Sequence, residues 1–152
     1  MDHDFWASLN KVVAGAGAYI TDPQGRPLLV KPNYRDHWSF AGGHIDEGEH
    51  PAQACAREVA EELGLSLPVG RLLTVQWGQL PEQPFPLIHF LFDCGIVEVD
   101  APVRLQAEEL DDYGFFTEEE SKGLLPPHLY DRLRAAGTAR RDGASLYLPP
   151  AG

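Results

Sequence analysis

Hydrophobic and polar positions follow one another along the chain in patterns that predict strands separated by helices. A loosely alternating run at 11–20 and a short apolar run at 28–31 predict two strands joined by the turn TDPQGRP, which is a β-hairpin. Longer runs at 71–79 and 86–99 predict two further strands on either side of a Pro-rich loop. Short strands are expected at 112–117 and 145–148, and a glycine-punctuated loop at 37–50.

The clearest helical pattern begins at Pro51 and ends before Gly64. Proline suits the first helical position and glycine suits the C-cap. An apolar stripe recurs at three- and four-residue steps, while the charged side chains fall off it. The stripe consists of Ala52, Cys55, Ala56, Val59 and Leu63, and the charged side chains are Arg57, Glu58, Glu61 and Glu62.

Two more helices are expected towards the C-terminus. The segment 117–124 opens with a capping box formed by Thr117 and Glu120, and 127–137 reads as a terminal helix that Gly137 ends. Strands mixed with helices in this order predict an α/β/α sandwich with a mixed central β-sheet.

Length and charge narrow the function classes. A chain of 152 residues with 43% hydrophobic residues suits one globular domain. Its net charge of −11 argues against binding to nucleic acid or to an anionic membrane, because both need a basic surface. No apolar run is long enough to cross a membrane, and the acidic N-terminus lacks a signal-peptide pattern, so a cytoplasmic location is expected. Cys55 and Cys94 match no metal-ligand spacing and are expected to be buried thiols.

Three glutamates stand close together on the predicted helix at Pro51–Leu63. Glu58, Glu61 and Glu62 occupy positions i, i+3 and i+4, which share one helix face and repel one another. Oxygen ligands in this arrangement suit Mg²⁺, Mn²⁺ or Ca²⁺. A solvated acidic face with Arg57 as its partner explains the same spacing, so the spacing alone does not decide between the two.

The residues before the helix extend this pattern. Gly43 is followed after five residues by Glu49, and after seven more by the run from Arg57 to Leu65, REVAEELGL. This resembles, without a mismatch, the signature of the Nudix hydrolases. The segments Trp38–His44 and Glu108–Phe116 are also similar to the family, although Ala41 stands where many members have proline. The resemblance covers about residues 10–135 of a single domain at 1–152, with a C-terminal helix and a Pro-rich tail after it.

The resemblance implies a Nudix-type α/β/α sandwich that hydrolyses the diphosphate bond of a nucleoside diphosphate linked to another moiety. It implies Mg²⁺ or Mn²⁺ held by Glu58 and Glu62, with the Gly42 carbonyl as a further ligand. Glu61 is either a third ligand or the general base, and Glu109 is the other candidate base, ahead of Glu108. Arg57 is expected to form an ion pair with Glu49 behind the metal site, and Gly43 to permit a tight turn.

Substrate contacts are less well defined by the sequence. Arg35 is a candidate phosphate partner, and Trp38, Phe40 and Trp77 are candidates for stacking on a base, although core packing explains the aromatic residues equally well. The expected partner is a small nucleotide-diphosphate substrate, without nucleic acid or membrane, and a homodimer stays open. Two alternatives remain: a Nudix-type domain that senses a nucleotide without cleaving it, and a family member with isomerase chemistry that uses Cys94.

Overall fold

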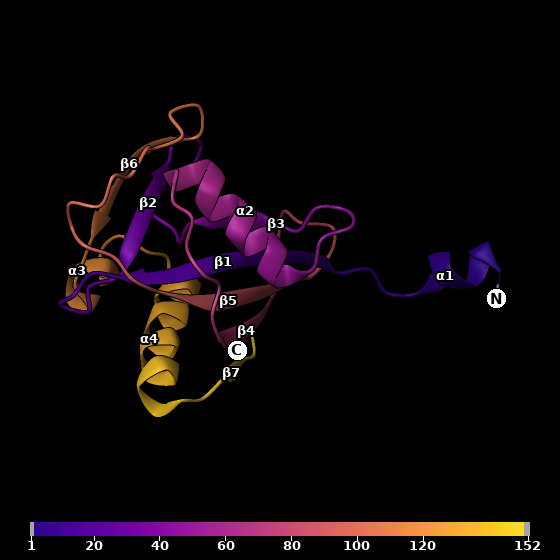
Figure 1. Ribbon diagram of the computed structural model, residues 1–152. Coiled ribbons are helices and arrows are strands. Elements are labelled where there is room, and N and C mark those ends of the chain that lie inside the picture. The colour runs from indigo at the N-terminus through magenta and orange to yellow at the C-terminus, as the bar shows by residue number, and fades with distance from the viewer. Residues whose placement is uncertain (1, 151–152) are drawn as a thin grey trace.

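A mixed five-stranded sheet in the order β3-β1-β5-β4-β7 forms the centre of the computed structural model, which describes residues 2–150 (Figure 1). β1 is parallel to β5 and β4 is parallel to β7, whereas the β1–β3 and β4–β5 pairs are antiparallel. The prediction of a mixed central sheet is therefore confirmed. The strands are β1 (Val13–Thr21), β3 (Gly42–His44), β4 (Leu72–Gly78), β5 (Leu87–Ile96) and β7 (Leu146–Leu148).

Helices cover both faces of this sheet, as a sandwich requires. Figure 1 shows α2 (Pro51–Leu63) on one face and α4 (Pro127–Asp142) on the other. Alternate residues of β1 serve the two layers, because side chains alternate across a strand. Ala16, Ala18 and Ile20 pack with α2, whereas Tyr19 packs with α4. The predicted α/β/α architecture is confirmed.

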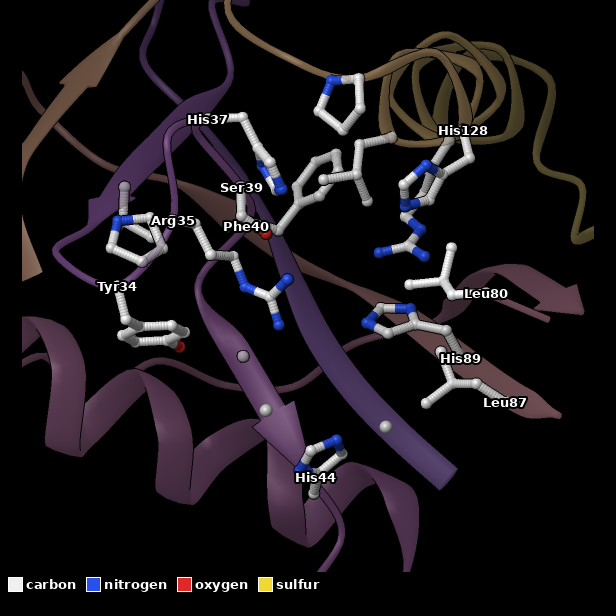
Figure 2. A pocket seen from close by; sticks show the side chains of 18 of the residues that line it. Tyr34, Arg35, His37, Ser39, Phe40, His44, Leu80, Leu87, His89 and His128 are labelled. Carbon is white, nitrogen blue, oxygen red and sulfur yellow. The ribbon is translucent and has the colours of Figure 1, made fainter. Parts of the chain in front are cut away.

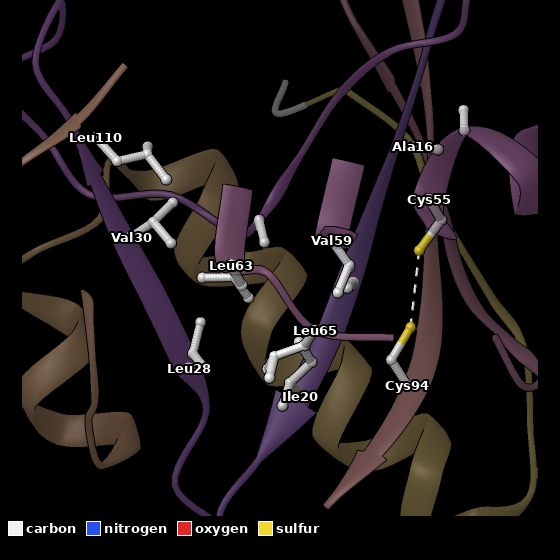
Figure 3. Close-up of a cluster of buried hydrophobic side chains, with 13 residues drawn as sticks. Ala16, Ile20, Leu28, Val30, Cys55, Val59, Leu63, Leu65, Cys94 and Leu110 are labelled. Carbon is white, nitrogen blue, oxygen red and sulfur yellow. Dashed lines mark hydrogen bonds between the residues drawn. The ribbon is translucent and has the colours of Figure 1, made fainter. Parts of the chain in front are cut away.

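The core beneath α2 is closely packed (Figure 3). Cys55, Val59 and Leu63 of α2 meet Ile20 of β1 in one buried cluster. Cys94 of β5 lies 3.7 Å from Cys55, sulfur to sulfur, and both are free buried thiols. Burial of these apolar side chains fixes the helix, and with it the glutamates on its adjacent face, against the sheet.

The expected hairpin forms only at its turn. Asp22 closes the turn by accepting bonds from the N–H groups of Gln24 and Arg26, both at 2.9 Å. Beyond the bridge between Thr21 and Pro27, β2 (Leu28–Pro32) leaves β1 and pairs with β6 (Leu110–Phe115) in a second, two-stranded sheet. The hairpin prediction was wrong because both edges of β1 are already occupied by β3 and β5.

Three other features of the secondary structure differ from the sequence prediction. Residues 42–44 form the short strand β3 instead of a loop, since β1 supplies backbone partners. α4 continues past Gly137 to Asp142 and is capped by Gly143, whose φ of 67° is left-handed. α1 (His3–Ser8), which the sequence did not predict, has no buried residue. α3 (Glu118–Lys122) begins at Thr117 with the expected capping box.

No helix in residues 2–150 combines the length and the apolar character needed to cross a membrane.

Candidate active site

A cavity of about 420 Å³ opens where β3 and the segment 34–40 face the start of α4. Glu62, Gly42 and Gly43 line one part of it. Histidines are concentrated there: four of the six in the chain line this cavity, and Figure 2 shows all four, namely His37, His44, His89 and His128. A nucleotide-sized ligand fits a hollow of this volume.

β1 contributes to the cavity through its glycines. The His89 ring of β5 lies against the β1 backbone, so that a β-carbon on Gly17 would come within 3.2 Å of the His89 Nε2 atom. Gly15 would meet the same ring at 3.3 Å. The run AGAGA thus places its alanines toward α2 and its glycines toward the cavity, where the absence of side chains lets the His89 ring lie against the β1 backbone.

Glu62 is buried, with 5% of its surface exposed. It lies on the same side of α2 as Val59 and Leu63, so the prediction that it falls off the apolar stripe was wrong, whereas Ala56 is exposed. The Gly42 N–H donates to Glu62 Oε1 at 2.6 Å. Burial raises the pKa of Glu62 to about 8, against this hydrogen bond, and the charges of Glu58 and Glu109 add to the rise.

Glu58 stands beside Glu62 one turn earlier, and its carboxylate lies close against Gly43 of β3. Its side chain is 14% exposed. A β-carbon built on Gly43 would lie 2.5 Å from Glu58 Oε1, so this carboxylate occupies space that only glycine leaves free. Burial raises the pKa of Glu58, while the neighbouring Arg57 lowers it.

Arg57 joins the carboxylates to the preceding loop. Its Nε and Nη2 atoms donate to the two carboxylate oxygens of Glu49 at 2.7 and 3.0 Å, so the predicted ion pair is present. Its Nη1 atom donates to Glu58 at 3.1 Å and to Glu61 at 3.2 Å. Nη2 also reaches the carbonyl of His44 at 3.2 Å. One guanidinium therefore fixes loop, strand and helix together.

The two candidate bases differ in position. Glu61 is about half exposed and is paired with Arg57, on the outer side of the helix. Glu109 lies in the turn before β6, where its backbone carbonyl accepts a bond from the Asn33 N–H at 2.9 Å. Its charge contributes to the raised pKa values of both Glu58 and Glu62. The charge of Glu109 thus acts on both carboxylates.

Glu58 and Glu62 offer oxygen ligands that suit a hard divalent cation, but they do not form a complete coordination shell by themselves. Glu62 is a buried carboxylate without an ion pair in residues 2–150, and Glu58 is its partly buried neighbour. As they stand, no three acidic, histidine or cysteine side chains of the described chain are grouped closely enough to hold an ion. Mg²⁺ typically takes one or two carboxylates and completes its shell with water and substrate oxygens. The residues fit that mode of binding.

The predicted substrate residues lie in three different places. Arg35 and Phe40 line the cavity, and Figure 2 shows the Arg35 side chain reaching into it. Trp77 borders a smaller adjoining hollow of about 220 Å³ instead. Trp38 lines neither, because it packs edge-on against Phe116 at 5.0 Å between ring centroids. The structure adds Arg132 and His128 of α4, for which the sequence carried no signal beyond helical periodicity.

Cys94 borders neither hollow. It is 3% exposed and turned into the core toward Cys55 (Figure 3). A cysteine in this position has no access to a ligand in either hollow, which removes the basis for the isomerase alternative.

Comparison with known proteins shows which proteins this chain is similar to. An uncharacterised Nudix hydrolase of Pseudomonas aeruginosa is 34% identical over 124 residues, covering 72% of this chain and 64% of that protein. An RNA pyrophosphohydrolase of a Psychrobacter species is 44% identical over 52 residues, covering 34% of this chain and 30% of that protein. The match therefore spans less than two thirds of either curated relative. Among solved structures, the MutT protein of Methanosarcina mazei has a TM-score of 0.74 at 27% identity, covering 88% of this chain and 99% of that chain.

The family model for the NUDIX domain matches residues 11–135, which is most of the chain. The chain belongs to the Nudix family.

Proposed function

We propose that this protein hydrolyses the diphosphate bond of a nucleoside diphosphate linked to another moiety, with Mg²⁺ or Mn²⁺ as the cofactor. The observation that carries the proposal is the pair Glu58 and Glu62 beside the Gly42–Gly43 strand: Glu62 is buried and lines a nucleotide-sized cavity, and Glu58 is its partly buried neighbour. Burying two like charges together is unfavourable unless a cation or a proton compensates them. The name of the Psychrobacter relative, RNA pyrophosphohydrolase, supports a reaction of this type.

Each residue has a role that its contacts support. Glu58 and Glu62 would hold the metal, with Glu61 or the Gly42 carbonyl as further ligands. A bound divalent ion supplies charge neutralisation of the diphosphate and a more acidic water. Arg57 and Glu49 keep Glu58 in place through their ion pair, and act as positioning residues. Arg35 lines the cavity and would contact a phosphate.

The general base needs a carboxylate that is free to accept a proton near the site. Glu109 meets this requirement better than Glu61, because Arg57 occupies Glu61 with an ion pair. We assign Glu109 as the base that takes the proton from the attacking water, and Glu61 as an auxiliary carboxylate.

The test is a panel of nucleoside diphosphate derivatives incubated with Mg²⁺ or Mn²⁺, with products identified by mass. Activity is expected with metal and not with a chelator. Glu58→Gln and Glu62→Gln should each lower kcat by orders of magnitude, while Glu119→Gln, an exposed glutamate on α3, should leave it unchanged. Tight binding of a panel member without product would instead identify a nucleotide sensor.

A further inference from the structure

The part of the cavity formed by α4 contains a cation that the catalytic proposal does not use. Arg132 is 5% exposed and borders both the main cavity and the adjoining hollow. Its guanidinium lies over the Phe40 ring, 5.9 Å from the ring centroid. No carboxylate in residues 2–150 forms a salt bridge with it. Arg132 is therefore a buried charge that nothing in the described chain neutralises.

Gln76 of β4 fixes the orientation of this side chain. Arg132 Nε donates to Gln76 Oε1 at 2.6 Å, and Gln76 Nε2 donates in turn to the His128 carbonyl at 3.0 Å. Nε is the only guanidinium nitrogen with a hydrogen-bond partner in the described residues. The Nη1 and Nη2 atoms are left as a parallel pair of donors, the geometry that binds two oxygens of one anion.

Two histidine side chains also border the cavity that Arg132 lines. His89 and His128 lie near it, and Figure 2 shows both rings at the cavity. Burial lowers the pKa of each histidine, and the charge of Arg132 lowers it further. His89 Nδ1 is buried and has no partner in the described chain, so it is a second unused polar atom.

We propose that Arg132, oriented by Gln76, binds an anionic group on the part of the substrate remote from the scissile diphosphate. Arg132 comes from α4 and Glu62 comes from α2, on opposite faces of the sheet (Figure 1), so the two side chains belong to different walls of the cavity that they share. The anion is a carboxylate or a further phosphate. A neutral base edge would also accept two bonds, but it would leave the buried charge uncompensated.

This inference rests on the proposed function and narrows its substrate class. It is tested with pairs of probes that differ by one anionic group. UDP-glucuronate differs from UDP-glucose by a carboxylate, and NADP differs from NAD by a phosphate. Affinity is measured by calorimetry in a Ca²⁺ buffer, and KM and kcat are measured separately with Mg²⁺.

The wild-type protein should favour the anionic member of at least one pair by about ten- to hundredfold. Arg132→Gln should reduce that ratio to near one, and Arg132→Lys should keep part of it. Gln76→Leu should lower the ratio without removing the charge. Arg134→Gln is the matched control, since Arg134 is on the same helix, 63% exposed and paired with Glu118.

Three results would overturn the proposal. The first is a wild-type protein that binds the anionic and neutral members of both pairs equally well, or that binds none of the four probes. This result is obtained on the wild type and does not depend on the folding of a variant. The second is an Arg132→Gln protein that loses both members of a pair equally. The third is an Arg132→Gln protein in which the preference between the uracil probes and the adenine probes changes while the anion preference does not. A wild-type protein that prefers the anionic probes but hydrolyses none of them would instead contradict the proposed catalytic function and leave the role of Arg132 intact.

Discussion

Glu58 Oε1 lies only 2.5 Å from the position that a β-carbon on Gly43 would take. Because α2 is fixed by its buried side chains, Gly43→Ala must displace the carboxylate and not the helix. We expect this variant to lose at least tenfold in kcat and in apparent Mg²⁺ affinity, since it moves a proposed ligand. Steady-state kinetics over a magnesium titration would measure both.

A glycine with open space provides the control for that experiment. A β-carbon on Gly78, at the end of β4, would have no neighbouring atom within 4 Å, so Gly78→Ala should leave kinetics unchanged. A Gly43→Ala protein with wild-type magnesium dependence would show that Glu58 is not a ligand.

The extent of what the sequence could predict is clearest on α2. Its start at Pro51, its end at Gly64 and its core residues Cys55, Val59 and Leu63 follow from local rules, because caps and periodicity are encoded within one helix. The burial of Glu62 does not. That burial depends on the N–H of Gly42 in β3, which donates to the Glu62 carboxylate. The sequence pattern of one helix carries no information on such a partner, so it predicts that every glutamate is exposed to solvent.

Pairing between distant segments was the main feature that the sequence could not supply. β2 leaves β1 for β6, which begins nearly eighty residues later, because the edges of β1 are taken. Arg132 reaches the cavity through the packing of α4 on the sheet, and its helix carries no motif. The candidate stacking residue Trp38 pairs with Phe116 for the same reason: its neighbour is set by tertiary structure.

The bidentate pair between Arg57 and Glu49 leads to a second prediction. Arg57→Lys keeps the charge but cannot donate simultaneously to Glu49, Glu58 and Glu61. We expect kcat to fall about ten- to hundredfold with a small change in KM, as is typical when a residue that orients a ligand is altered. Kinetics of Arg57→Lys, Glu49→Gln and the double variant would measure the coupling. Additive effects of the two single variants would contradict a shared role.

Arg140 should contribute to stability without affecting catalysis. Its guanidinium donates to Asp93 at 2.8 Å and to Thr21 at 2.6 Å, and lies 4.6 Å from the centroid of the Tyr19 ring. Arg140→Met should lower the free energy of unfolding by about 2 kcal/mol, because it removes charged hydrogen bonds at a partly buried site. That corresponds to a fall in Tm of about 4–8 °C. Arg141→Met, at an exposed neighbouring position, should change Tm by much less.

The buried carboxylate of Glu62 makes the metal-free protein sensitive to pH. Its pKa is about 8 in the folded protein against 4.5 as the ordinary value, so between these pH values the folded state retains a proton that the unfolded state has released. The free energy of unfolding therefore falls as pH rises through this window. With a chelator present, the Tm of the wild type should decrease from pH 5 to pH 8 more steeply than that of Glu62→Gln, which has no proton to lose. Mg²⁺ added at pH 8 should raise the Tm of the wild type and have little effect on the variant. If Tm changed equally with pH in the two proteins, Glu62 would be ionised from pH 5 to pH 8. The folded protein would then accommodate its charge without a cation or a rearrangement.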